Sequence, residues 1–148
     1  MSRRARAARR GALPLLLCLA ACAPRDAADL SMREGRALLA AGAVEEAASA
    51  FGGAAVLRPD DAAAHAAHGA ALLRLRRLGQ AETALRRATE IDPGLGAAWR
   101  DLGRILLETG RPAEAARVLR RAYALGRGRD AAIREDLIRA VEASPAAL

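Results

Sequence analysis

Apolar residues between positions 97 and 125 recur at helical spacing. The first group contains Trp99, Leu102, Leu106 and Leu107. Steps of three or four residues place such side chains on one face of a helix, which we predict over residues 97–109. Gly110 suits the turn that follows this helix, and Pro112 suits the first turn of the next. The stretch therefore predicts two helices joined by a tight turn, the second of them ending near Leu125.

The same pattern occurs three times along the chain, at a constant interval and without a gap. The small residues that recur are Gly35, Gly69, Gly103, Ala47, Ala81, Ala115, Ala54, Ala88 and Ala122. Large apolar residues recur in the same register at Leu38, Leu72, Leu106, Phe51, Leu85 and Leu119. Pro59 and Pro93 fall where the second helices of the first two units must end, because proline cannot continue a helix.

The third unit, Trp99-x-x-Leu102-Gly103-x-x-Leu106 followed by Gly110 and Ala115, resembles the tetratricopeptide repeat (TPR). The interval between units agrees, since this repeat has a period of about 34 residues. The resemblance implies an all-α fold, an α-solenoid of three tandem TPR helix hairpins. The expected units are residues 28–61, 62–95 and 96–129. Each hairpin alone leaves an apolar face open, so stacking is needed to bury it.

The last unit of such an array needs a cap with a polar outer face. Residues 130–148 supply a helix with apolar residues on one side and charged residues on the other, ending before Pro145. We interpret it as a C-terminal capping helix, and the alternative is a displaced seventh helix that binds a partner.

Two features of the hairpins carry further expectations. Gly103 should let the paired helices approach closely by facing Ala115 or Ala122, since a large side chain there would overpack the contact. The first unit looks looser, because Gly52 and Gly53 interrupt its second helix and glycine is a poor helix former.

The N-terminus has the layout of a secretory signal peptide, with basic residues 1–10 before a short apolar run that ends at Ala21. Leu19-Ala20-Ala21-Cys22 resembles the lipobox of bacterial lipoproteins. That resemblance implies cleavage of residues 1–21, lipidation of Cys22, a short linker over residues 22–27 and a membrane anchor at the periplasmic face of the outer membrane. The alternative is ordinary cleavage, which would leave a soluble periplasmic protein.

Composition removes nucleic acid as an expected partner. The formal charge is +7, but five arginines lie in the first ten residues, and the rest of the chain holds 19 arginines against 17 acids. The remaining arginines alternate with acids and form no basic block that would track a phosphate backbone.

No catalytic residues or cofactor-binding residues are expected, and the chain is not predicted to be an enzyme. His65 and His68 are three residues apart and share a helical face, a spacing that can bind a metal. They align with the packing positions Trp99 and Leu102, and no third ligand is evident. We expect packing residues and no metal site, with a metal-handling accessory role as the less favoured alternative.

In TPR proteins the first helices of the units line a concave groove that binds a peptide or a helix of a partner protein. Matching positions give the expected groove residues: Met32, Arg36, Leu39, Ala66, Ala70, Leu73, Arg74, Arg100, Arg104, Leu107 and Glu108. Arginine pairs well with carboxylates, so the hypothesis is an acidic and apolar segment. The alternative is that these arginines form only a solvated face.

The resemblances together predict a non-enzymatic, lipid-anchored scaffold for protein–protein interaction. Its architecture is similar to that of TPR lipoproteins of Flp/Tad or type IV pilus assembly, so the expected role is to assist assembly of an envelope complex such as a pilus or a secretion system. The alternative is a soluble periplasmic chaperone or adaptor.

Overall fold

The computed structural model describes the backbone of residues 13–144 and the side chains of residues 26–144. This part of the chain is all-helical and contains no strand, which confirms the predicted fold class. Its seven helices are α1 (Leu13–Ala40), α2 (Val44–Leu57), α3 (Ala62–Arg74), α4 (Leu78–Ile91), α5 (Gly96–Glu108), α6 (Pro112–Leu125) and α7 (Ala131–Ala143).

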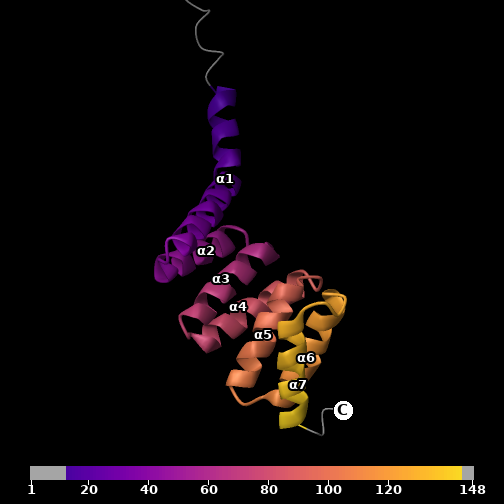
Figure 1. Ribbon diagram of the computed structural model, residues 1–148. Helices are drawn as coiled ribbons and strands as arrows, with labels where there is room; N and C mark the ends of the chain where they lie inside the picture. Colours follow the sequence, from indigo (N-terminus) through magenta and orange to yellow (C-terminus); the bar gives the residue numbers. More distant parts are fainter. Residues whose placement is uncertain (1–12, 145–148) are drawn as a thin grey trace, which may run out of the picture.

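The first six helices form three hairpins that stack in sequence order (Figure 1). Helix α1 pairs with α2, α3 with α4, and α5 with α6, while each hairpin also packs against the next. Helix α7 packs on α6 and α5 at the far end of the array. The predicted α-solenoid is therefore the observed architecture, and α7 lies where a cap is expected.

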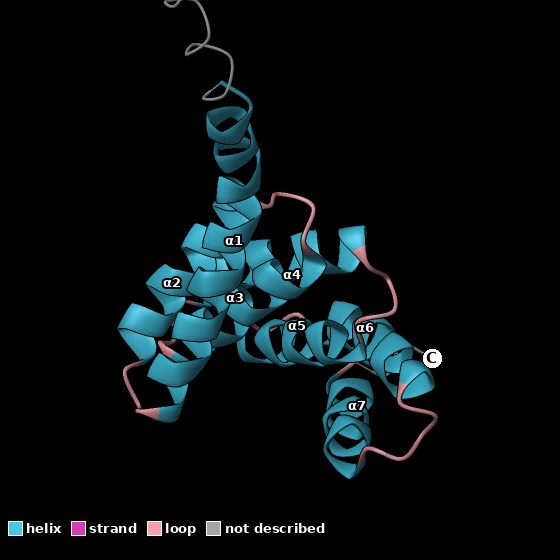
Figure 2. Ribbon diagram, turned by 90° about the horizontal axis from the view of Figure 1, so that it is seen from above, coloured by secondary structure: helices cyan, strands magenta, loops and turns pink. Residues whose placement is uncertain are grey.

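Helix α1 is about twice as long as the other helices and projects beyond α2 (Figures 1 and 2). It runs through residues 22–27, which we predicted from the sequence to be a short linker. These residues are instead helical. Residues 1–12 of the predicted signal peptide, the side chain of Cys22 and residues 145–148 lie outside the described set. Within residues 13–144, no helix is both long and apolar enough to cross a membrane.

Helix ends follow from local chemistry. The Oδ1 atom of Asp61 accepts hydrogen bonds from the backbone N–H groups of Ala63 and Ala64, at 2.9 and 3.2 Å, and so caps α3. Asp130 caps α7 in the same way. Such caps satisfy backbone donors that have no partner within the helix. Helices α2 and α4 end two residues before the prolines Pro59 and Pro93.

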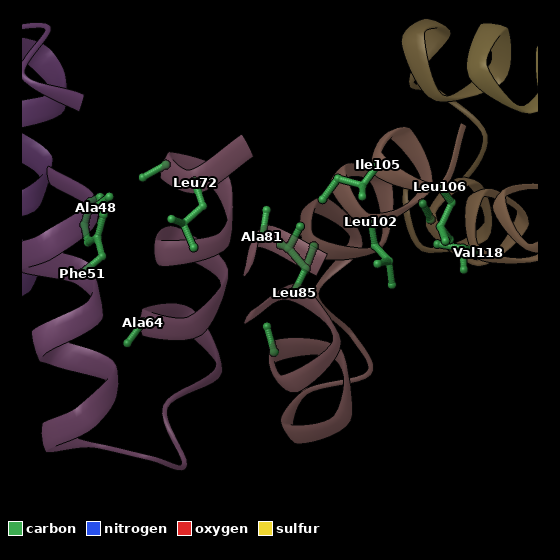
Figure 3. Packing of buried hydrophobic residues seen from close by; sticks show 14 of the residues in the cluster. Ala48, Phe51, Ala64, Leu72, Ala81, Leu85, Leu102, Ile105, Leu106 and Val118 are labelled. Carbon is green, nitrogen blue, oxygen red and sulfur yellow. The ribbon is translucent and has the colours of Figure 1, made fainter. Parts of the chain in front are cut away.

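The core consists mainly of alanine and leucine and runs without a break through the stacked hairpins (Figure 3). All nine small repeat residues named from the sequence are buried, and the six alanines among them are fully buried. Each of the three glycines faces a large side chain of the paired helix: Phe51, Leu85 or Leu119.

The prediction of which residue faces Gly103 was wrong. A Cβ atom at Gly103 would come within 2.5 Å of Leu119 Cγ, so the close partner is Leu119 and not Ala115 or Ala122. The reason is that Leu119 packs its branched end onto the open backbone that the glycine provides. The small residue is needed to admit a large side chain from the opposite helix.

The expected interruption of α2 is also absent, because the helix continues through Gly52 and Gly53. Tertiary packing explains this outcome: Ala47, Ala48, Phe51, Ala54 and Ala55 form a buried face that holds the helix in place. Packing of an amphipathic face commonly outweighs the intrinsic propensity of single residues.

Helix α7 lacks the glycine that the preceding first helices share. Gly69 and Gly103 are the eighth residues of α3 and α5, and the eighth residue of α7 is Ile138. Its side chain is 51% exposed. A leucine of a further second helix therefore finds no open backbone on α7.

The turn between the two helices of each hairpin contains a residue with positive φ. Gly42 and Gly110 occupy this position in the first and third hairpins, with φ of 81° and 73°, and Arg76 occupies it in the second with φ of 61°. A non-glycine residue in this left-handed region is strained by steric contact with its Cβ atom. The side chain of Arg76 forms an exposed ion pair with Glu108.

Replacing Arg76 with glycine is expected to raise the free energy of unfolding by about 0.5–1 kcal/mol, because the strain is removed and an exposed ion pair contributes little. Urea denaturation monitored by circular dichroism measures the change. Arg76→Ala is the matched control, since it removes the ion pair and keeps the Cβ atom. An equal gain in both variants would contradict the explanation from strain.

Candidate functional site

A hollow of about 520 Å³ lies between α5 and α7, and we call it the α5–α7 groove. Helix α5 contributes the four residues expected from the sequence: Arg100, Arg104, Leu107 and Glu108. Helix α7 supplies the other wall with Ala132, Glu135, Asp136 and Arg139. The groove therefore combines a leucine with charges of both signs.

Helix α7 is held in this place by its buried side. Ile133 and Ala140 point into the core, which leaves Asp136 and Arg139 facing the groove. The guanidinium of Arg139 is 3.2 Å from a carboxylate oxygen of Asp136. The four α7 residues were not among the groove residues predicted from the sequence, which favoured a cap for this helix and gave a partner-binding helix only as the alternative. The available signal was that α7 follows three first helices in order and so takes the place of a fourth.

Helix α3 continues the same surface toward the N-terminus. Ala66, Ala70 and Leu73 are half-buried, and Arg74 is exposed. Leu39, Leu73 and Leu107 recur at the repeat interval, so the three first helices present a leucine at equivalent positions. The ion pair between Arg76 and Glu108 joins the end of α3 to α5. Glu108 thus has its charge balanced within the array.

Met32 lies apart from the other expected groove residues. Its side chain is buried in the core cluster, while Arg36 is exposed and Leu39 is half-buried. Met32 therefore belongs to the core, and of the three groove residues expected on α1 only Arg36 and Leu39 are accessible. The sequence signal was ambiguous because a buried and an accessible apolar position have the same helical spacing.

The arginines of this surface fall into two groups. Arg36, Arg74 and Arg104 are exposed and have no ion pair with any described side chain. Arg100 is half-buried, and its Nε atom donates a hydrogen bond of 3.1 Å to Asp101. The first group can therefore accept an external carboxylate without breaking a contact, whereas Arg100 is already engaged.

Two models of the tetratricopeptide repeat match residues 32–96 and 72–135, and together they span most of the chain. The chain belongs to the tetratricopeptide repeat family. No curated protein matches it in sequence.

Solved TPR domains share the fold of this TPR protein at low identity. The Arabidopsis OM64 TPR domain is 23% identical, with a TM-score of 0.76, and the match covers 80% of this chain and 98% of that one. The yeast Sti1 TPR2B domain in complex with pHsp70 is 22% identical, with a TM-score of 0.73, covering 78% and 96%. The second TPR domain of human RPAP3, in complex with the HSP70 peptide SGPTIEEVD, is 19% identical with a TM-score of 0.74, covering 79% and 97%.

The two histidines of the TPR protein lie on another face of α3. His65 Nε2 is 3.1 Å from the carbonyl oxygen of Pro59, and Trp99 Nε1 donates to the carbonyl of Pro93 at 2.9 Å. The two pairs occupy equivalent positions of successive units, so His65 makes in the second unit the contact that Trp99 makes in the third. Among the described residues, no group of three or more His, Cys, Asp or Glu side chains is placed to hold a metal ion.

His68 is half-buried, and burial lowers the pKa of its imidazole, with a further lowering by the neighbouring His65. Because the pKa in the folded state lies below the unfolded value near 6.5, the unfolded chain binds more protons at mildly acidic pH. Stability should therefore fall as the pH drops below about 6.5.

We expect the TPR protein to lose stability between pH 7.5 and pH 5.5, and His68→Leu to lose less over the same interval. Leucine is the residue at the equivalent position 102. Urea midpoints at the two pH values provide the measurement. Glu82 should not contribute to this loss. Burial acts to raise the pKa of Glu82, but hydrogen bonds from Arg111 and Arg86 outweigh that effect and lower the pKa, so the carboxylate stays ionised between pH 7.5 and pH 5.5. Equal losses in both proteins would refute the role of His68.

Proposed function

We propose that this TPR protein is a non-enzymatic scaffold that binds an acidic and apolar segment of a partner protein along α1, α3 and α5, as far as the α5–α7 groove. The observation that carries the proposal is the set of three exposed arginines without ion pairs to described side chains, one on each of α1, α3 and α5. Each of the three helices also carries a half-buried leucine at the equivalent positions 39, 73 and 107. Such a surface matches a segment that carries both carboxylates and apolar side chains.

Arginine suits this role because its planar guanidinium forms paired hydrogen bonds with a carboxylate. The half-buried leucines offer apolar contact area to a ligand, which distinguishes this surface from one made only of solvated charges. The human RPAP3 domain binds an HSP70 peptide that contains Glu-Glu-Val-Asp, an acidic segment with an apolar residue. The present chain contains no asparagine or lysine. The chaperone-type carboxylate clamp, which binds the C-terminal carboxylate of a peptide, therefore lacks its asparagines here. We propose an internal segment of the partner as the ligand.

We further propose that the protein is anchored through a lipidated Cys22 at the periplasmic face of the outer membrane. Residues 22–27 are helical and lead directly into the first hairpin, so cleavage before Cys22 would leave the array close to its anchor. This placement suits a factor that assists assembly of an envelope complex such as a pilus or a secretion system. Without lipidation, the same groove would belong to a soluble periplasmic adaptor.

Peptide binding tests the scaffold. Fluorescently labelled peptides that alternate Glu or Asp with Leu should raise fluorescence anisotropy on titration with the protein, and the signal should weaken with salt because the contacts are charged. Peptides of the same composition with Lys in place of the acids are the control. Equal binding of acidic and basic peptides would reject the proposed ligand class.

Mass spectrometry of the mature protein tests the anchor independently. An N-terminal Cys22 carrying acyl chains is the expected species, and Cys22→Ala should release the protein from membranes. An unmodified N-terminus would support the soluble adaptor instead.

A further inference from the structure

A second hollow, of about 690 Å³, lies between α2, α3 and α4, on the face of α3 that carries His65 and His68. We call it the α2–α4 hollow. Its volume falls within the range of about 300–1,000 Å³ that is typical of small-molecule sites. It shares no lining residue with the α5–α7 groove.

The repeat supplies an internal comparison in the next pair of second helices, α4 and α6, which are linked by side chains. There, four charged side chains form an ion cluster on the surface between α4 and α6. Arg86 and Arg111 each bind both Glu82 and Glu114, with distances of 2.8 Å from each arginine to Glu82 Oε1. The cluster bridges the two helices and occupies the space between them.

The α2–α4 hollow lacks this cluster. The residues that stand one repeat before Glu82, Arg86 and Glu114 are Ala48, Gly52 and Gln80, and all three line the hollow. Only the arginine is kept, as Arg77 in place of Arg111. The sequence therefore removes both carboxylates and one guanidinium, and it leaves open the space that they fill one repeat later.

The floor of the hollow pairs a glycine with an imidazole. A Cβ atom on Gly52 would lie 3.2 Å from His68 Nε2, closer than an ordinary van der Waals contact, so the glycine gives the ring its place. Among residues 26–144, no side chain or backbone group hydrogen-bonds to His68. Its imidazole is available to a polar group of a ligand, while Leu72, Ala55 and Ala84 provide apolar surface.

The charge of the hollow has one sign. Arg77 and Arg87 line it, and no carboxylate of the described residues does. Their guanidinium groups pair outside the lining with Glu45, at 2.6 Å, and with Glu90, at 3.4 Å. All four side chains of these pairs are about half exposed or more. Exposed ion pairs contribute little to stability, so either arginine can exchange its partner for a ligand anion.

We propose that the α2–α4 hollow is a binding site for a small apolar carboxylic acid. The hydrocarbon part lies against Leu72, Ala55, Ala84 and the exposed Val56, and the carboxylate reaches Arg77 or Arg87 at the rim. The site is separate from the peptide groove and does not depend on the scaffold function. The ligand class follows from an apolar floor combined with a lining in which the arginines Arg77 and Arg87 are present and carboxylates are absent among the described residues.

Isothermal titration with decanoate, below its micelle concentration, tests the site in the purified full-length chain. Saturable 1:1 binding is expected, with at least tenfold weaker binding of 1-decanol, which keeps the chain and lacks the charge. Equal affinity for both compounds, or no saturable binding of decanoate, would overturn the proposal.

Two variants locate the site. Ala48→Glu combined with Gly52→Arg introduces the acid and the arginine of the next repeat, fills the hollow and should abolish decanoate binding. Arg77→Gln combined with Arg87→Gln changes only exposed side chains and should weaken binding about tenfold. Arg117→Gln combined with Arg121→Gln, on α6, is the matched control and should leave binding unchanged. Retained affinity in the Arg77/Arg87 variant would overturn the assignment even if the filled variant failed to fold.

Discussion

Replacing Leu119 with alanine is expected to lower the free energy of unfolding by about 2–5 kcal/mol, the range for a large-to-small change in a core. The side chain of Leu119 is fully buried, and it packs directly onto the backbone of Gly103 on the paired helix. Alanine would leave a cavity between α5 and α6, which are the helices of the third hairpin. Urea denaturation at pH 7.5 measures the loss.

The same contact predicts a coupling between the two positions. Gly103→Ala alone should destabilise the protein by about 1–3 kcal/mol, because its new Cβ atom would lie 2.5 Å from Leu119. In the Leu119→Ala background the clash is absent, and the same change should be neutral or stabilising. The four proteins form a double-mutant cycle.

Gly53→Ala is the control for helix propensity. No atom lies within 4 Å of a Cβ placed at Gly53, so alanine should stabilise α2 by about 0.5–1 kcal/mol.

The outcome of the double-mutant cycle decides the explanation. Independent effects of the changes at positions 103 and 119 would contradict the observed packing of leucine on glycine.

Reversing the charge of the three exposed arginines without ion pairs on α1, α3 and α5 should weaken binding of acidic peptides by about 100-fold or more, equivalent to about 2.8 kcal/mol. The variant combines Arg36→Glu, Arg74→Glu and Arg104→Glu. Each change replaces an attraction to a carboxylate with a repulsion. Fluorescence anisotropy with the acidic and apolar peptides gives the affinity.

A control with the same change in net charge separates groove contacts from overall charge. It carries Glu at Arg117, Arg121 and Arg134, which are exposed, lie on α6 and α7, and belong neither to the α5–α7 groove lining nor to the surface of α1, α3 and α5. This control should retain most of the affinity, and an equal loss in both triple variants would remove the groove from the explanation. Arg100 is left unchanged because its bond to the nearly buried Asp101 gives it a structural role.

The hairpins could be predicted from the sequence because the repeat makes every position visible three times. A glycine or a leucine that recurs at the repeat interval reports a packing or turn requirement that one occurrence would leave ambiguous. The partner of Gly103 could not be predicted in this way, since Ala115, Leu119 and Ala122 recur equally well. Choosing among them requires the rotation of one helix against the other, which the spacing does not contain.

The groove was only partly predictable. Positions on α3 and α5 followed from the family pattern, but the contribution of α7 did not, because this helix has no paired second helix among the described residues and begins one position late in the repeat register. The α2–α4 hollow was not anticipated either. It arises from what is missing at positions 48, 52 and 80, and it becomes recognisable only once the ion cluster between α4 and α6 is known.

Ile138 limits how this array can grow. Tandem repeats commonly lengthen by copying a unit, and a copied second helix would bring its leucine to the eighth residue of α7. The isoleucine there blocks that approach, so an appended hairpin would remain unpaired until the position became glycine. Engineers who wish to lengthen the solenoid should therefore begin with Ile138→Gly, before they add any new segment.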